Sequence, residues 1–399
     1  MISRRRTFIC IVALALFAAV PSALASNNWY VDGVNGSNSN NCMSSQTACK
    51  TIVHVVSLTS PGDSIFVAPA TYVESVKIFF DLNIFGSGAA TTIIDGGGAS
   101  SQVVVIGSGK PNTRVTLSQM TFRNGTGPED GGGIYNCIGA TTIIDSVISG
   151  NKIHHGNGSF GYGAGIYNCP NGILTLINTT VSGNSAEIGG AICNGGTLTI
   201  INSTFSGNLA RQRRGGAIAN YGTLSITNST FSGNSSGSSG IAGGILNGGL
   251  FQSAGTLLIN NSTFSGNTGV AGGGSIYNIR GSKAVIQNSI IANNTGVNCA
   301  GTGSVTSGGY NLSSDSSCNF NGTGDLNSTD PQLSPLQNNG GPTQTMALLP
   351  GSPAIDSGNP AGCTDSNGNL LKTDQRGQAR PDGEDSGGCD RGAYERQKD

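Results

Sequence analysis

Apolar and polar residues alternate along the middle of the chain in very short runs. Each run covers three to five residues, as around Leu198 and Ile200, and ends at Gly or Asn. A period of two over so few residues predicts short β-strands separated by sharp turns. Glycine and β-branched residues are dense across 131–295 and no 3.6-residue period appears there, which excludes helices.

These short runs belong to a repeat. The segment GGAICNGGTLTIINSTFSGN at 189–208 aligns with GGAIANYGTLSITNSTFSGN at 215–234, and the same frame recurs at 131–136, 163–168, 243–249 and 273–278. Three short strands in each unit of about 25 residues predict an all-β fold, a right-handed parallel β-helix. With coils stacked at about 4.8 Å, the solenoid has about nine or ten coils.

Three columns of asparagine accompany the repeat. An amide side chain donates to the next amide and accepts from the previous one at strand spacing, so we expect each column to form a ladder. Asn also tolerates the left-handed backbone that tight corners require. The first column contains Asn136, Asn168, Asn194, Asn220, Asn247 and Asn278; the second contains Asp145, Asn178, Asn202, Asn228, Asn261 and Asn288; the third contains Asn151, Asn184, Asn208, Asn234, Asn267 and Asn294.

The two ends of the chain lack the repeat. Residues 1–25 carry three arginines, an apolar run of about twelve residues and the sequence Ala23-Leu24-Ala25, which predicts a signal peptide. That run is shorter than the roughly 20 residues of a membrane-spanning helix, and we expect no transmembrane segment elsewhere. We assign 26–60 to an N-terminal cap with a short helix within 48–58, 61–321 to the β-helix, and 322–399 to a C-terminal cap that folds back over the last coil.

The charge balance excludes some partners. With 20 basic and 21 acidic side chains, the chain has a formal net charge of −1. Nucleic acids and strongly anionic membranes are bound through dense Lys and Arg, so we expect neither as a partner.

Nine cysteines follow the predicted signal peptide, an odd number that leaves one unpaired. The economical local pairs are Cys42 with Cys49, Cys299 with Cys318 and Cys363 with Cys389, although the sequence leaves the connectivity open. Cys137 and Cys169 follow the first Asn column in adjacent coils, where a disulfide between coils fits the spacing. Cys193 is the candidate free thiol. No pair has zinc-ribbon spacing, and we expect no metal or cofactor.

Several segments resemble known families. The GGAI tetrads and FSGN corners resemble the repeats of chlamydial polymorphic outer membrane proteins. The tail at 330–363, with TDQRGQARP at 373–381 and CDRGAYE at 389–395, resembles choice-of-anchor Q domain proteins of bacteria, and WYVDGVNGSN at 29–38 is similar to the start of pectin-lyase-like β-helix proteins. These resemblances imply the fold and secretion, not a reaction. In the anchor family a sorting signal commonly follows the Gly-Ala-x-Glu motif, whereas four residues remain here, so we expect release or noncovalent attachment to a cell surface.

The segments that follow the SGN corners differ in length and hold most of the charge of the central repeats. If these segments share one edge, they line a groove for an extended glycan; the alternative is that they are solvated turns. The candidate ligand-binding residues are Glu129, Asp130, His154, His155, Glu187, Arg211, Arg213 and Arg214.

Two functions fit this pattern. The first is a noncatalytic, secreted scaffold for adhesion or glycan binding. The second is a polysaccharide lyase or glycoside hydrolase with its site in the same segments, and calcium is expected only for the lyase. Asp145 and Glu187 are the acidic residues within the visible repeats, and Asp145 is explained by its Asn column, so we assign no catalytic residue.

Overall fold

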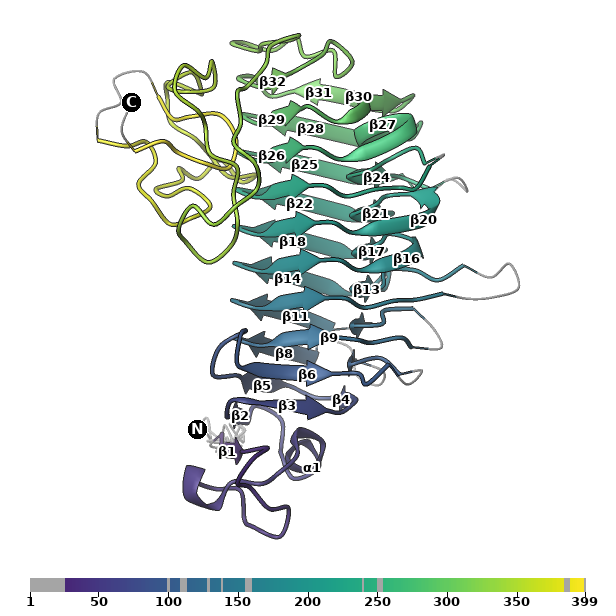
Figure 1. Ribbon diagram of the computed structural model, residues 1–399, viewed down its shortest axis with the longest axis vertical. Coiled ribbons are helices and arrows are strands. Elements are labelled where there is room, and N and C mark those ends of the chain that lie inside the picture. Colours follow the sequence, from purple (N-terminus) through teal and green to yellow (C-terminus); the bar gives the residue numbers. More distant parts are fainter. Residues whose placement is uncertain are drawn as a thin grey trace, which may run out of the picture.

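The protein is a rod of stacked coils with a long C-terminal segment along one flank (Figure 1). The computed structural model describes residues 26–98, 101–107, 113–127, 130–137, 139–154, 160–238, 240–249, 254–383 and 388–397, with only the backbone of Arg213. The predicted signal peptide therefore lies outside the described residues. None of the helices described is long and apolar enough to cross a membrane.

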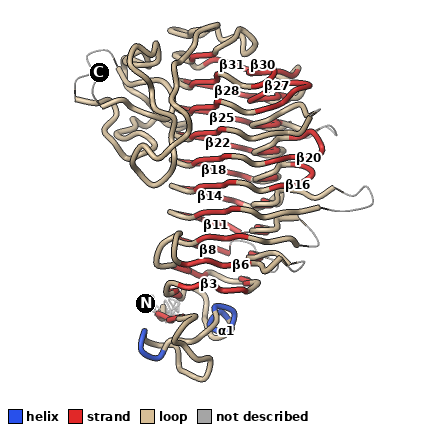
Figure 2. The backbone as a smooth tube through the Cα atoms, in the orientation of Figure 1, coloured by secondary structure: helices blue, strands red, loops and turns tan. Residues whose placement is uncertain are grey.

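Three parallel sheets run the length of the rod, and Figure 2 shows their strands in red. Sheet A contains β1 (Asn28–Val31), β2 (Ser64–Val67), β5 (Leu82–Phe85), β8 (Thr113–Ser118), β11 (Gly139–Ile144), β14 (Ile173–Ile177), β18 (Thr197–Ile201), β22 (Thr223–Thr227), β25 (Thr256–Asn260), β28 (Lys283–Gln287) and β31 (Ser304–Ser307). Sheet B contains β3 (Ala70–Val73), β6 (Thr92–Asp95), β9 (Thr121–Arg123), β12 (Val147–Ser149), β15 (Thr180–Ser182), β19 (Thr204–Ser206), β23 (Thr230–Ser232), β26 (Thr263–Ser265), β29 (Ile290–Ala292) and β32 (Leu312–Ser313). Sheet C contains β4 (Val76–Ile78), β7 (Val104–Ile106), β10 (Ile134–Asn136), β13 (Ile166–Asn168), β17 (Ile192–Asn194), β21 (Ile218–Asn220), β24 (Ile245–Asn247), β27 (Thr268–Asn278) and β30 (Thr295–Gly301).

Each coil passes through sheets A, B and C in that order. Nine successive coils, which we number from β2, place a strand in all three sheets, and β31 and β32 begin a tenth. The predicted right-handed parallel β-helix is therefore confirmed.

Equivalent residues of neighbouring coils stack directly in the core. Leu198 pairs with Leu224 and Ile200 with Ile226 across sheet A. The phenyl rings of Phe205, Phe231 and Phe264 stack at 4.6 and 4.5 Å between centroids, and all three are fully buried. This in-register stacking of like side chains keeps the core continuous from coil to coil.

Two of the three asparagine columns form continuous ladders. In the first column, each Nδ2 donates to the Oδ1 of the next residue at 2.7–2.8 Å from Asn136 to Asn278. In the third column, the same bonds run from Asn151 to Asn294 at 2.8–3.1 Å. The side chains from Asn136 to Asn278 in this column are fully buried and cannot reach solvent. The ladder therefore supplies the hydrogen-bond partners that their amide groups need.

The second column forms two of the expected bonds, from Asn178 to Asp145 and from Asn288 to Asn261 at 2.9 Å each, but it is not continuous, so our expectation of a complete ladder is wrong. Its members have φ values of 48–51°, as the corner between sheets A and B requires. However, Asn228 donates to the carbonyl of Thr373 and Asn261 to that of Thr364, at 2.8 and 2.7 Å. The C-terminal segment takes the bonds that neighbouring coils would otherwise make.

The N-terminal segment closes the first coil. The strand β1 extends sheet A by pairing with β2, and the 3₁₀ helix η1 (Ser45–Thr47) and helix α1 (Ile52–Val56) follow. The side chain of Thr51 caps α1 by accepting from the backbone N–H of His54. Ile52, Val55 and Val56 are buried against the core, so the short helix expected within 48–58 covers the open end of the solenoid.

The C-terminal segment closes the other end and then turns back along the rod. Cys318 and Phe320 join the main core, and Leu326 bridges to Leu312 of the last coil. The later residues lie beside the corner between sheets A and B, where Thr343 donates to the carbonyl of Asn202 in the sixth coil. The segment therefore covers a flank, shown in yellow in Figure 1, as well as the last coil that we expected it to cover.

Buried arginines fasten this segment to the rod. The guanidinium of Arg380 is fully buried and donates to Glu395 at 2.6 Å, to Asn228 Oδ1 at 2.9 Å and to the carbonyl of Gly392 at 2.9 Å. Arg391 donates to the carbonyl of Asn311 at 2.8 Å. The two arginines belong to the tail motifs at 373–381 and 389–395, which here have a structural role.

The first ladder supports a stability prediction. Replacing Asn194 with Ala leaves the buried Oδ1 of Asn220 without its ladder donor and removes one of the acceptors of Asn168 Nδ2, so we expect the free energy of unfolding to fall by roughly 1–3 kcal/mol. Asn202→Gly in the next coil is the control, because its Oδ1 has no partner and glycine accepts its φ of 51°. Urea unfolding monitored by circular dichroism measures both, and equal losses would contradict the role of the ladder.

The clamp on the C-terminal segment predicts a pH dependence. Burial raises the pKa of Glu395 to about 7, against the opposing effect of Arg380, and the nearby Asp390 raises it further. The folded state thus holds a proton that the unfolded state loses near pH 4.5, so stability decreases between about pH 4.5 and 7 by roughly 3 kcal/mol. Urea unfolding at pH 5 and pH 8 should show this loss in the wild type and a smaller loss in Glu395→Gln. The exposed Asp330→Asn serves as the control, and an unchanged pH dependence in Glu395→Gln would refute the assignment.

Candidate functional site

The segments of variable length all lie between sheets B and C. They follow glycines with φ of 62–72° at the corner positions Gly150, Gly183, Gly207, Gly233 and Gly266. Figure 1 shows these segments on the side of the rod opposite the C-terminal segment. One edge of the molecule therefore presents all of them, and the C-terminal segment covers the corner between sheets A and B from the sixth coil onward.

The predicted charged residues do not form one row along this edge. Glu187 is buried, at 1% exposure, and its carboxylate accepts from His154 Nδ1 at 2.6 Å and from the Gly161 N–H at 3.1 Å. His154 and Arg211 are exposed. Glu187 therefore orients His154 and does not line a groove.

Three of the predicted residues fall outside what is described, and two others each lie near a tyrosine. Glu129, His155 and the side chain of Arg213 are outside the described residues. Asp130 Oδ1 accepts from the Tyr162 N–H at 2.8 Å, and Arg214 is close enough to Tyr221 to influence the pKa of its phenol. The sequence analysis did not select these two tyrosines, which lie just outside strands β13 and β21 of sheet C.

The outer face of sheet C carries a column of residues whose size changes abruptly. One residue per strand stands in direct register, and the order from β7 to β27 is Val105, Tyr135, Tyr167, Cys193, Ala219, Leu246 and Tyr277. Tyr135 and Tyr167 stack with their ring centroids 5.6 Å apart. The next two residues are small, so the second face of the Tyr167 ring has no aromatic neighbour within the column.

This change of size produces a hollow of about 410 Å³, which we call the tyrosine hollow. It is lined by Tyr162, Tyr167, Pro170, Cys193, Gly195 and Tyr221. Tyr167 forms one end, and Tyr162 is tilted by 57° against it at 6.4 Å between centroids. Arg214 and Tyr221 flank in sequence the strand that carries Ala219, and Tyr221 lines the hollow.

The hollow combines ring faces with hydrogen-bond donors. Burial raises the pKa of Tyr162, Tyr167 and Tyr221 above that of a free phenol, so their hydroxyl groups stay protonated. Arg214 adds a cation and Asp130 an anion near the rim. Such a site suits a ligand with one apolar face and several hydroxyl groups.

The sequence contained a signal for this hollow. The residue between Ile and Asn in each unit is Tyr in GGGIYN and GAGIYN, Cys in GGAICN and Ala in GGAIAN. The change from large to small side chains at one repeat position marks a gap on the outer face of a stacked sheet.

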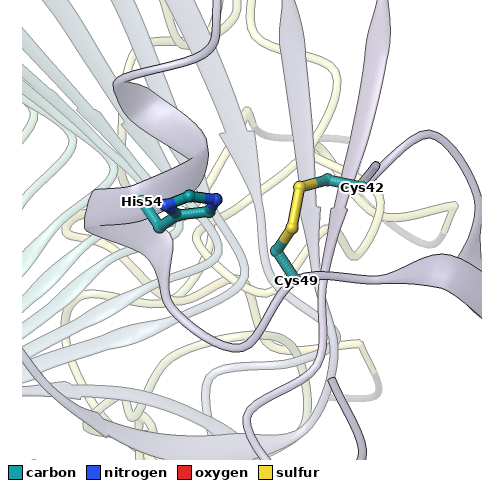
Figure 3. Close-up of side chains that lie close together, drawn as sticks. All are labelled: Cys42, Cys49 and His54. Carbon is teal, nitrogen blue, oxygen red and sulfur yellow. A yellow bond between two sulfur atoms is a disulfide. The ribbon is translucent and has the colours of Figure 1, made fainter. Parts of the chain in front are cut away.

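Three potential metal ligands lie close together in the N-terminal cap. The ligand atoms of Cys42, Cys49 and His54 are within 4.8 Å of one another, the one such group among the residues that the structure describes. The two sulfur atoms are bonded to each other (Figure 3). A disulfide offers no thiolate, so this group does not fit a metal ion.

Four disulfides leave one free thiol among the residues that the structure describes. The bonds are Cys42–Cys49, Cys137–Cys169, Cys299–Cys318 and Cys363–Cys389, the pairs that the spacing favoured. Cys193 is free and is 2% exposed at the floor of the tyrosine hollow.

No protein-family model and no curated protein matches the chain. Among solved structures, it is similar to the pectate lyase Pel9A, with 15% identity over 93% of this chain and 96% of that one and a TM-score of 0.49. It is also similar to a rhamnogalacturonan lyase, with 10% identity over 82% of this chain and 96% of the other and a TM-score of 0.46. At this distance neither likeness bears on activity.

The burial of Cys193 predicts its reactivity. Burial raises the pKa of its thiol, so we expect negligible labelling by a thiol-specific disulfide reagent at pH 8 in the folded protein. After denaturation without reductant, one thiol per chain should react in protein that lacks residues 1–25, and none in Cys193→Ala. Rapid labelling of the folded wild type would contradict the burial of this side chain.

Proposed function

We propose that the protein is an extracellular glycan-binding scaffold and that the tyrosine hollow holds a sugar unit of its ligand. The observation that carries the proposal is the ring face of Tyr167 turned toward the small residues Cys193 and Ala219. A pyranose ring presents C–H groups on one face and hydroxyl groups around its rim. The C–H face packs on the tyrosine ring, and the rim reaches the polar groups of the hollow.

Size and polarity support a saccharide. The volume of about 410 Å³ lies within the range of small-molecule sites, roughly 300–1,000 Å³. The phenols of Tyr162 and Tyr221 and the guanidinium of Arg214 supply donors on both sides of the ring face. Because the hollow lies on the outer face of a sheet, a long chain could continue past it in either direction.

An extracellular location is part of this proposal. Four disulfides among nine cysteines are typical of exported proteins. The basic and apolar N-terminal sequence and the resemblance of the tail to choice-of-anchor Q domain proteins favour the same location.

The second candidate is a polysaccharide lyase or hydrolase. One observation favours it: the buried carboxylate of Glu187 fixes Nδ1 of His154, whose side chain is 66% exposed. A histidine oriented in this way is a suitable general base. Binding and cleavage are separated by following both the intact polysaccharide and the products.

Tyr167→Ala tests the binding site. We expect the wild type to be retarded in affinity electrophoresis by at least one of a panel of plant and microbial polysaccharides, and the variant to bind about tenfold more weakly because the ring face is lost. Tyr277→Ala, in the same column two coils beyond Ala219, is the matched control and should bind like the wild type.

Cys193→Tyr tests the hollow in the opposite way. Tyrosine already occupies this repeat position at 135 and 167, so the coil should accept it while the hollow is filled. Loss of binding supports the site, and wild-type binding by both Cys193→Tyr and Tyr167→Ala overturns it. Release of oligosaccharides, detected by chromatography with and without calcium and abolished by His154→Ala, would establish the enzymatic alternative.

A further inference from the structure

A second hollow lies on the same edge of the rod, toward its N-terminal end. It has a volume of about 380 Å³ and, unlike the tyrosine hollow, has no aromatic lining. Its lining residues come from the B-to-C corners of the second, third and fourth coils: Asp95, Gly97, Gly98, Asn124, Thr126, Gly150 and Lys152. We call it the polar hollow.

The corner backbone makes room for this hollow. Asn124 and Gly150 occupy equivalent corner positions with φ of 57° and 65°, and Gly97 and Gly98 have φ of 66° and 67°. A Cβ atom at Gly150 would meet only Asn124 Oδ1, at 3.9 Å. Three glycines in the left-handed region thus leave the side chains of Asp95 and Asn124 accessible from outside.

Asp95 is a fixed acceptor in the hollow. Its side chain is 10% exposed, its Oδ1 accepts from the Gly97 N–H at 2.9 Å, and its Oδ2 accepts from Arg123 Nε at 2.7 Å and from Asn124 Nδ2 at 2.9 Å. Burial by itself raises the pKa of Asp95, but these hydrogen bonds outweigh it and lower the pKa. The carboxylate is therefore ionised, and Oδ1 retains capacity for another donor.

Thr126 supplies an independent indication of a ligand. Its Oγ1 is buried and has no hydrogen-bond partner, although it lines the hollow. A buried hydroxyl group without a partner costs free energy unless a bound molecule satisfies it.

The balance of charge and of donors selects the class of ligand. The N–H groups of Gly97 and Gly98 already donate to Asp95 and to the carbonyl of Asn124, so they do not form an anion-binding nest. Asp95 is paired with Arg123, and Lys152 is exposed at the rim, so the hollow has no excess of negative charge for a metal ion. Adjacent acceptors and donors at fixed positions match a neutral molecule that both donates and accepts.

We infer that the polar hollow binds two adjacent hydroxyl groups of a neutral sugar. One hydroxyl group donates to Asp95 Oδ1, and its neighbour bonds with the side chains of Asn124 and Thr126. The site is separate from the tyrosine hollow, although the segment 150–165 contributes Lys152 to one and Tyr162 to the other. The inference stands on its own lining residues and does not rest on the proposed function.

Asn124→Gly tests this inference, because glycine keeps the corner conformation and removes the amide. The probes are methyl α-mannoside, methyl β-galactoside and methyl β-glucoside, observed by saturation-transfer NMR with the full mature protein. We expect at least one probe to bind saturably and to bind about fivefold more weakly to Asn124→Gly. Thr126→Val, which replaces the hydroxyl group by a methyl group of similar size, should weaken binding by a similar factor without lowering the melting temperature.

Asn293→Gly is the matched control, because Asn293 is an exposed corner residue with the same φ of 57° in the ninth coil. It should bind the probe like the wild type. The inference is overturned if none of the three glycosides binds, if Asn124→Gly and Asn293→Gly bind equally well, or if inorganic phosphate displaces the glycoside. The same comparison of Asn124→Gly with Asn293→Gly is made in the Tyr167→Ala background, where the ring face of the tyrosine hollow is lost, so failure here is distinguishable from failure of the tyrosine hollow.

Discussion

Each buried side-chain amide of the rod needs a hydrogen-bond partner inside the protein, and the rest of the structure depends on this requirement. The ladder from Asn136 to Asn278 meets it with one side chain per coil, and the ladder from Asn151 to Asn294 meets it at a second corner. Because an amide side chain both donates and accepts, each asparagine can bond to the one before it and the one after it. The ladder can therefore continue through any number of coils that keep the same register. The ladders fix the direction of the chain at two corners, and the apolar columns fill the space between them.

The third corner satisfies the same requirement in a different way. Its asparagines keep the left-handed conformation, but Asn228, Asn261 and Asn288 donate to a segment more than 100 residues later in the chain. The guanidinium groups of Arg380 and Arg391 are buried between the C-terminal segment and the rod. There they donate to the carboxylate of Glu395 and to backbone carbonyls. Removing one hydrogen-bond partner of a buried charged group lowers the stability of the folded state. The C-terminal segment and the corner therefore each require the other to be in place. This arrangement leaves the opposite edge free for the two hollows.

The fold was predictable because its determinants are local and repeated. The alternation around Leu198 and Leu224 and the 26-residue shift between their units specify both strands and register. The contact of Arg380 with Asn228 was not predictable, because no sequence pattern near either residue indicates a hydrogen bond to a residue 152 positions away. Glu187 resembled a surface charge because the sequence does not reveal that His154 and Gly161 fold over it. The change from Tyr167 to Cys193 was visible in the repeat, but its meaning depends on knowing which face the position occupies.

The C-terminal segment is bonded to one part of the rod, the sixth and later coils, which we call the clasped part; the first five coils are the unclasped part. The segment touches the corner from the sixth coil to the end, whereas the described residues of the first five coils are held by their neighbours, by the N-terminal cap and by the Cys137–Cys169 bond. In a stacked array, stability is the sum of neighbouring interfaces, so opening begins where the fewest interfaces are made. The polar hollow lies wholly in the unclasped part. The tyrosine hollow extends from the unclasped part into the sixth coil, which carries Tyr221. A ligand bound across these coils would act as a second clasp and slow the fraying of the rod from its N-terminal side.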